Sequence, residues 1–221
     1  MTNMLRNYCR PVASAAALLA CVGVPFAPAR AGQSPLELAC ARNPSLTAYT
    51  FHMDVTLAMH HFPWLHFRLS GEGQNVRGER YIVKFTTMPF FAKRLNEIDL
   101  SELDPRMWDK QYIVRLVDQQ NSTATFSLTS RDEGQDQKSA SLKDALVTLD
   151  ANYATRTVVL QYANGGNITL NLTPESTSGY LLPATGEAQI NMPGEALSAH
   201  ASFTDYAVVS HEAVASGQTN R

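Results

Sequence analysis

The stretch "YTFHMDVTLAMHHFPWLHFRLSG", residues 49–71, decides the fold of this chain. In its first eleven residues, large apolar side chains occupy the odd positions, and mostly polar or small side chains occupy the even ones. A period of two places successive side chains on opposite faces of a β-strand. The alternation resumes after Pro63, from Leu65 to Leu69. The stretch therefore predicts two consecutive strands, each with one apolar face, joined at a proline that does not disturb the ladder.

Four of the six histidines lie in this stretch, namely His52, His60, His61 and His66. Their parity places three of them on the polar face and only His61 on the apolar face. A zinc or copper site needs three or four convergent ligands. His60 and His66 on neighbouring strands offer two, and an acid such as Asp54 or Glu72 offers a third. A solvated outer face explains the same residues, so no metal site is predicted.

Residues 1–31 have the order of a secretory signal peptide. Two arginines and no acid precede an apolar run at residues 12–26, and the small-residue sequence Ala29-Arg30-Ala31 follows. The apolar run is too short, and too interrupted by proline, for a membrane span. We therefore expect an exported, periplasmic protein whose single domain comprises residues 32–221.

A second processing site overlaps the first, because Leu18-Leu19-Ala20-Cys21 resembles a bacterial lipobox. In that alternative an acylated Cys21 begins the mature chain and anchors it to a membrane. Either cleavage leaves Cys40 without an intramolecular disulfide partner, so stability must come from core packing.

The charge balance argues against nucleic acid as a partner. The whole chain has 18 basic and 20 acidic residues, a formal net charge of -2. Loss of residues 1–31 removes three arginines and leaves 15 basic residues against the same 20 acids. A mature chain with this balance lacks the basic footprint that phosphate binding requires.

The rest of the chain continues the strand pattern, with two interruptions. A capped helix is expected at residues 35–42, because Ser34-Pro35-Leu36-Glu37 forms a capping box. Residues 88–110 lack a strand period and contain helix starts at Asp99 and Asp104-Pro105, so they predict a long connection with one or two helical turns. Further strands are predicted around residues 81–86, 112–116, 124–128, 158–162, 168–172, 188–192 and 199–209, while residues 141–149 suit either a helical turn or a strand.

Eight or more antiparallel strands with one apolar face need a cover on that face. The few short helices expected here cannot cover so wide a sheet. The sheet must then split into a sandwich or curl towards closure around an apolar hollow.

Four segments together resemble the LolA/LolB-like fold of bacterial envelope carriers. They are the strand "LTAYTFHMDVTLAM" at residues 46–59, the return strand "GERYIVKFTTMP" at 78–89, the connection "PFFAK" at 89–93 and the hairpin "TVVLQYANGGNITLNL" at 157–172. The resemblance implies a mainly β (α+β) fold, in which a strongly curved antiparallel sheet forms an unclosed barrel. Short helices would serve as the N-terminal element and as a lid.

The resemblance also implies a cargo and partners: a lipid or an acylated lipoprotein, with transient protein partners in the inner or outer membrane. No cofactor and no covalent chemistry are implied. The residues themselves also favour a protein without covalent chemistry, because the sequence contains no Gly-x-Ser-x-Gly elbow, paired free thiol or phosphate-binding loop. We therefore expect a carrier rather than an enzyme.

Parity selects the residues expected to line the hollow, and methionines among them would adapt to variable apolar ligands. The candidate ligand-binding set is Phe51, Met53, Leu57, Met59, Leu65, Phe67, Leu69 and Phe85, and the candidate lid residues are Phe90, Phe91 and Trp108. The alternatives are an envelope interaction module, in which the same side chains fill an ordinary core, and a histidine-site metalloprotein.

Overall fold

The computed structural model describes residues 33–62, 64–87, 97–120, 122–131 and 142–211. The chain from Gln33 to Arg221 forms one compact unit. The expected signal peptide, Cys21, Phe90 and Phe91 lie outside the described residues.

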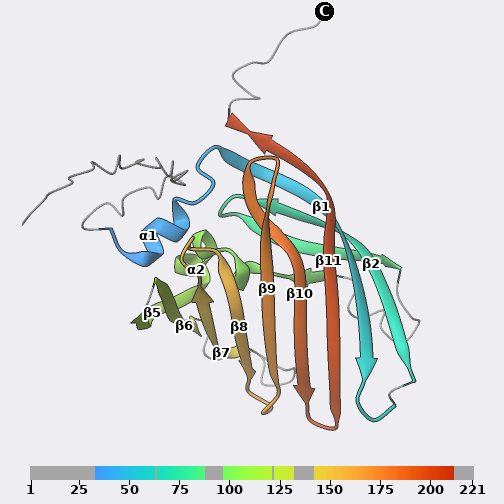
Figure 1. Ribbon diagram of the computed structural model, residues 1–221. Coiled ribbons are helices and arrows are strands. Elements are labelled where there is room, and N and C mark those ends of the chain that lie inside the picture. Colours follow the sequence, from blue (N-terminus) through green and yellow to red (C-terminus); the bar gives the residue numbers. More distant parts are fainter. Residues whose placement is uncertain (1–32, 63, 88–96, 121, 132–141, 212–221) are drawn as a thin grey trace, which may run out of the picture. The chain divides into compact units, whose positions relative to one another are not determined.

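The described residues form a single curved, antiparallel sheet of eleven strands (Figure 1). Its order is β4-β3-β2-β1-β11-β10-β9-β8-β7-β6-β5, so β4 and β5 end the sheet and do not pair with each other. This is the mainly β, unclosed architecture that the resemblance implies, and of the two arrangements left open by the alternation it is the curled sheet and not the sandwich. The strands are β1 (Leu46–Met59), β2 (His66–Val76), β3 (Arg80–Thr87), β4 (Glu97–Asp99), β5 (Tyr112–Gln120), β6 (Thr123–Ser130), β7 (Leu142–Leu149), β8 (Thr155–Tyr162), β9 (Asn167–Thr177), β10 (Tyr180–Met192) and β11 (Glu195–Ser210).

The described helical elements are short. Helix α1 (Pro35–Cys40) has the predicted capping box, since Ser34 accepts from the Glu37 backbone and Glu37 accepts from the Ser34 backbone. A 3-10 turn, η2 (Ser101–Leu103), and helix α2 (Pro105–Gln111) supply the predicted helical turns. Within the described part of the chain, none of the helices has the length and apolar character needed to cross a membrane.

Several boundaries differ from expectation for physical reasons. In the ambiguous segment 141–149, the described residues Leu142–Leu149 form strand β7, whose residues pair with the neighbouring strands β6 and β8. The three-residue strand β4 was not predicted, because so short a strand has no readable period. Strand β2 continues to Val76, beyond the alternating stretch that ends at Leu69.

The β1–β2 register confirms the parity argument across the Pro63 bend. Val55 lies opposite Leu69, and Leu57 lies opposite Phe67, so the odd residues of both strands share one face. The helices also lie on this face, because Trp108 of α2 packs on Phe126 of β6 within the same apolar core. We call it the helix-bearing face.

Two glycines in β2 make room for the aromatic core. A Cβ atom at Gly73 would overlap the ring of Phe51, which lies across the strand and is 1% exposed. A Cβ atom at Gly71 would lie 2.6 Å from the carbonyl oxygen of Lys84 on β3. These glycines permit a close approach inside the strand, which accounts for their presence where a side chain would otherwise pack.

Replacing Gly73 by alanine should therefore lower the free energy of unfolding by about 1–3 kcal/mol, because the Phe51 ring must shift. The measurement is urea denaturation. Gly186→Ala on β10 is the matched control, since its new methyl group would meet the flexible Leu172 side chain at 3.3 Å. Equal losses in both variants would contradict this account, and Phe51→Leu should recover part of the Gly73→Ala loss.

Candidate functional site

The helix-bearing face is filled at one end. Trp108 is 0% exposed, contacts Phe126 at a ring-centroid distance of 5.5 Å, and donates from Nε1 to the Glu102 carbonyl oxygen at 3.0 Å. Leu103, Met107 and Ala39 from the helical elements join the same core. This end is closely packed, and Trp108 belongs to its core rather than to an open cover.

The structure divides the predicted hollow residues into two groups. Three of them are buried in the core. Of the other five, Met53 is half-buried between the buried Phe51 and Val55 of β1, and four lie towards the far ends of β1 and β2, half-buried or, for Leu65, exposed. The buried members are Phe51, Leu69 and Phe85, and the others are Met53, Leu57, Met59, Leu65 and Phe67.

The half-buried group continues across the sheet as an apolar band. Leu57 lies opposite Ala199, which lies opposite Ala188, which lies opposite Leu170. A parallel row one pair further along joins Met59 of β1 to Leu160 of β8. The apolar band consists of Leu57, Met59, Phe67, Leu160, Ile168, Leu170, Ala188, Ile190, Leu197 and Ala199, all half-buried.

The band lies towards the end of the sheet that carries the β1–β2, β8–β9 and β10–β11 turns, whereas α1 and α2 lie nearer the other end (Figure 1). It crosses β2, β1, β11, β10, β9 and β8 without a charged side chain. A surface of this kind can bind extended aliphatic chains through apolar burial, at about 0.8 kcal/mol for each CH2 group. Its members on β8 to β11 were missed from the sequence, because alternation there gives the face but not the register between strands.

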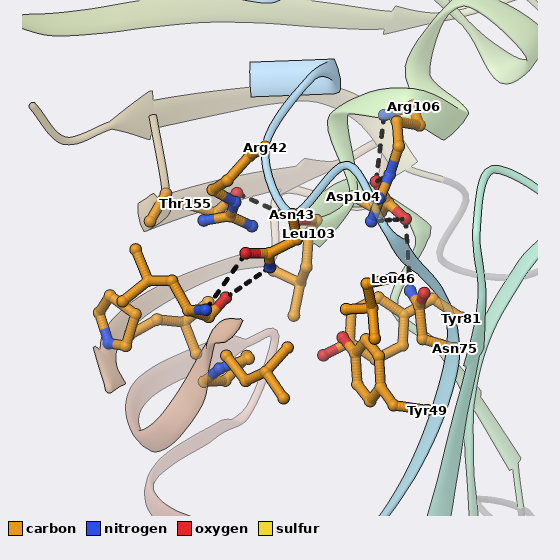
Figure 2. A pocket seen from close by; sticks show the side chains of 16 residues that line it. Arg42, Asn43, Leu46, Tyr49, Asn75, Tyr81, Leu103, Asp104, Arg106 and Thr155 are labelled. Atoms are coloured by element: carbon orange, nitrogen blue, oxygen red, sulfur yellow. Dashed lines mark hydrogen bonds and ion pairs between the residues drawn. The ribbon is translucent and has the colours of Figure 1, made fainter. Parts of the chain in front are cut away.

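A small polar pocket lies at the filled end, between the α1–β1 connection, η2 and strand β10 (Figure 2). Its free volume is about 30 Å³. That is room for about one water molecule and not for an acyl chain. Tyr81 is buried in its wall, and the Tyr81 hydroxyl has no hydrogen-bond partner among the described residues. Burial raises the pKa of the adjacent Tyr49 to about 12, so its hydroxyl stays protonated.

Hydrogen bonds around this pocket attach the helices to the sheet. Asp104, the N-cap of α2, is buried and accepts from Arg106 Nε at 2.7 Å and from Asn75 Nδ2 at 3.3 Å. Asn43 has a φ of 51° and pairs its side-chain amide with the backbone of Leu181 on β10. Arg77 donates to four carbonyl groups from Cys40 to Leu46 at 2.8–3.2 Å.

Substituting Asp104 by alanine should lower the free energy of unfolding by about 3 kcal/mol, because it removes the cap and leaves the Arg106 guanidinium largely buried without its carboxylate. The control is Asp109→Ala in the same helix, at an exposed position, with an expected change within about 0.5 kcal/mol. Thermal and urea unfolding measure both variants. A similar small loss in the two would show that the buried pair does not stabilise the docking of α2.

On the opposite face, His52 lies between a hydroxyl and a carboxylate. His52 Nδ1 is 2.9 Å from Glu72 Oε1, and His52 Nε2 is 2.9 Å from Ser70 Oγ. This order resembles a serine–histidine–acid triad. Both strands lie inside the sheet, however, so ladder hydrogen bonds engage the nearby backbone N–H groups that an oxyanion hole would need. We assign the cluster to cross-strand pairing on the outer face.

The Glu72 carboxylate, through its hydrogen bond, raises the pKa of His52. The stabilisation from this pair should be complete below about pH 6.5, the ordinary imidazole value, and should be lost as pH rises through the raised pKa. NMR titration should therefore show a lower His52 pKa in Glu72→Gln. The stability difference between wild type and variant should be larger at about pH 5 than at about pH 8.5. Glu79→Gln, at an exposed turn position, is the control, and an unchanged His52 titration in Glu72→Gln would contradict the assignment.

The remaining histidines of the opening stretch do not converge. His60 and His66 are exposed, and His61, expected on the apolar face, is exposed in the turn beyond β1. This expectation was wrong because strand parity ends where β1 ends, at Met59. Among the described residues, no group of three or more histidine, cysteine, aspartate or glutamate side chains is arranged to hold a metal ion.

Comparison with known proteins gives a match only at the level of structure. No family model matches the sequence, and no curated protein matches it. A LolA superfamily protein from Nitrosomonas europaea superposes with a TM-score of 0.56 at 14% identity, over 80% of this chain and 93% of that one. The chain has a LolA-like fold.

Two further solved structures agree with the LolA-like fold. A domain from Vibrio parahaemolyticus, named for outer membrane lipoprotein sorting, gives a TM-score of 0.52 at 12% identity, over 80% of this chain and 94% of that one. A DUF1329 family protein from Desulfovibrio piger gives 0.54 at 8% identity, over 79% and 91%. At these identities the likeness is one of fold.

Proposed function

We propose that this protein is a carrier that holds acyl chains of lipids or lipoproteins on the apolar band, within the bacterial envelope. The observation that carries the proposal is the band itself, a half-buried apolar surface that crosses six strands beside a fully packed core. A soluble domain normally buries such a surface, so its exposure indicates a ligand or partner.

The LolA-like fold supports this proposal, since one structural neighbour is named for lipoprotein sorting. The signal-peptide pattern at residues 1–31 supports export to the periplasm. Binding by apolar burial needs no cofactor and no covalent step, which is consistent with a carrier rather than an enzyme. The acylated-Cys21 alternative would make the protein a membrane-anchored acceptor, and the intact mass of the mature N-terminus distinguishes the two forms.

The variant Leu57→Glu tests the band directly. Wild-type protein should brighten a dansyl-labelled fatty acid, and it should carry lipid in native mass spectrometry when purified without detergent. A buried carboxylate at position 57 should weaken fatty-acid binding by roughly tenfold or more. Leu197→Gln is a milder second variant in case Leu57→Glu folds poorly.

The matched control is Thr56→Glu, which adds the same charge one residue away on the exposed outer face. It should bind the dansyl-labelled fatty acid as wild type does. A wild-type protein that neither carries lipid nor brightens the fatty acid would sink the carrier proposal, and so would equal weakening by Leu57→Glu and Thr56→Glu.

A second candidate function is an envelope interaction module. Edge strand β5 favours it, because Ile113, Leu116 and Val117 are exposed large apolar residues at the end of the sheet. Exposed edge strands can pair with a strand from another chain. A lipid-free protein that forms a stable complex through β5 would favour this function over the carrier.

A further inference from the structure

The turn between β1 and β2 ends in exposed aromatic residues. Trp64 is 77% exposed and Phe62 is 47% exposed, and their rings meet edge to face at a centroid distance of 5.7 Å. Leu65 beside them is also exposed. We call Phe62, Trp64 and Leu65 the tip. Its exposure contrasts with Trp108, the chain's other tryptophan, which is fully buried.

The tip is attached to the end of the apolar band by the backbone. The Met59 N–H donates to the Leu65 carbonyl oxygen at 3.5 Å, and the His60 N–H donates to the Ala196 carbonyl oxygen at 2.9 Å. Met59 lies opposite Leu197, the band residue of β11 nearest the turn. The tip therefore adjoins the end of the band.

The segment that carries the tip has one permanently charged residue, Arg68, and no acidic residue. Residues 60–68 contain three histidines and Arg68 but no acid, although the chain as a whole has more acidic than basic residues. His60, His66 and Arg68 are exposed. Anionic groups can therefore approach the tip without repulsion from its own segment. The exposed acid beside it is Glu195, at the start of strand β11.

Tryptophan, whose apolar ring carries a polar N–H group, is favoured where hydrocarbon meets lipid headgroups. Phenylalanine and leucine bury their side chains at the adjoining acyl boundary. We propose that the tip docks in the interfacial region of a lipid bilayer that contains anionic lipids, with Trp64 at headgroup depth and Phe62 at the adjoining acyl boundary. Docking turns the open end of the apolar band towards the membrane. This surface goes beyond the carrier function, because it concerns how the protein meets a bilayer and not what the band holds.

Tryptophan fluorescence reports the docking, because Trp64 is exposed and Trp108 is not. With vesicles of phosphatidylethanolamine and phosphatidylglycerol, wild-type emission should shift to shorter wavelength and lose its quenching by iodide. Co-sedimentation with these vesicles should fall by roughly tenfold in the double variant Phe62→Ser, Trp64→Ser. Vesicles of phosphatidylcholine alone should bind the wild type more weakly than the anionic vesicles.

The control variant is Val209→Ser, which removes an exposed apolar side chain from the other end of the sheet. It should sediment with vesicles as wild type does, and the tip variant should keep the wild-type unfolding midpoint because its side chains are exposed. A wild-type protein that stays in the supernatant with both kinds of vesicle would overturn the proposal, as would a tip variant that sediments equally well.

Loading with the dansyl-labelled fatty acid separates this proposal from the carrier function. A protein that docks through the tip without loading the fatty acid keeps the docking surface and loses the carrier function. A protein that loads the fatty acid but does not bind vesicles would contradict the docking proposal alone.

Discussion

The structure depends on one constraint: the sheet has a wide apolar face, and the short helical elements cover only part of it. The eleven described strands share one apolar face, and the described helical elements lie against one end of that face. Apolar surface that remains in contact with water costs about 25 cal/mol per Å² relative to burial. The filled end satisfies this requirement within the chain, while the apolar band stays half-buried. Core and candidate site are therefore parts of one continuous surface.

The sheet keeps one filled end and one apolar band only if the helices stay packed at the filled end. Burial of the Trp108 ring supplies apolar contact, but apolar contact alone does not fix orientation. The buried Asp104 does, because its carboxylate must meet both the α2 backbone and Asn75 of β2. Arg77 fixes the other helix by binding the carbonyl groups that follow it. These hydrogen bonds lie around the polar pocket. Its small volume reflects a role in holding the helices on the sheet.

The local part of this arrangement could be predicted from the sequence. Alternation from Tyr49 to Leu69 is a property of consecutive residues. It assigned faces correctly within β1 and β2, and it failed for His61 in the turn between them. The cap of α1 and the start of α2 at Asp104-Pro105 were equally local. Contacts between segments that are far apart in the sequence could not be predicted. The burial of Trp108 against Phe126, for example, depends on which strands lie under α2. The same limitation hid Ile168 and Ile190, whose place in the band depends on the pairing of β9 with β10.

One hairpin, β1 to β2, contributes to three surfaces with different physical demands. Its buried residues around Phe51 need close complementarity, which explains why the facing position must be Gly73. Its half-buried residues, such as Leu57, need only to be apolar and of suitable size, a condition that many side chains meet. Its outer face needs only compatible polar pairs, such as His52 with Glu72. Only the close packing around Phe51 restricts the sequence strongly, and it involves few positions. A fold held this way can therefore keep its architecture at 8–14% identity to its structural neighbours.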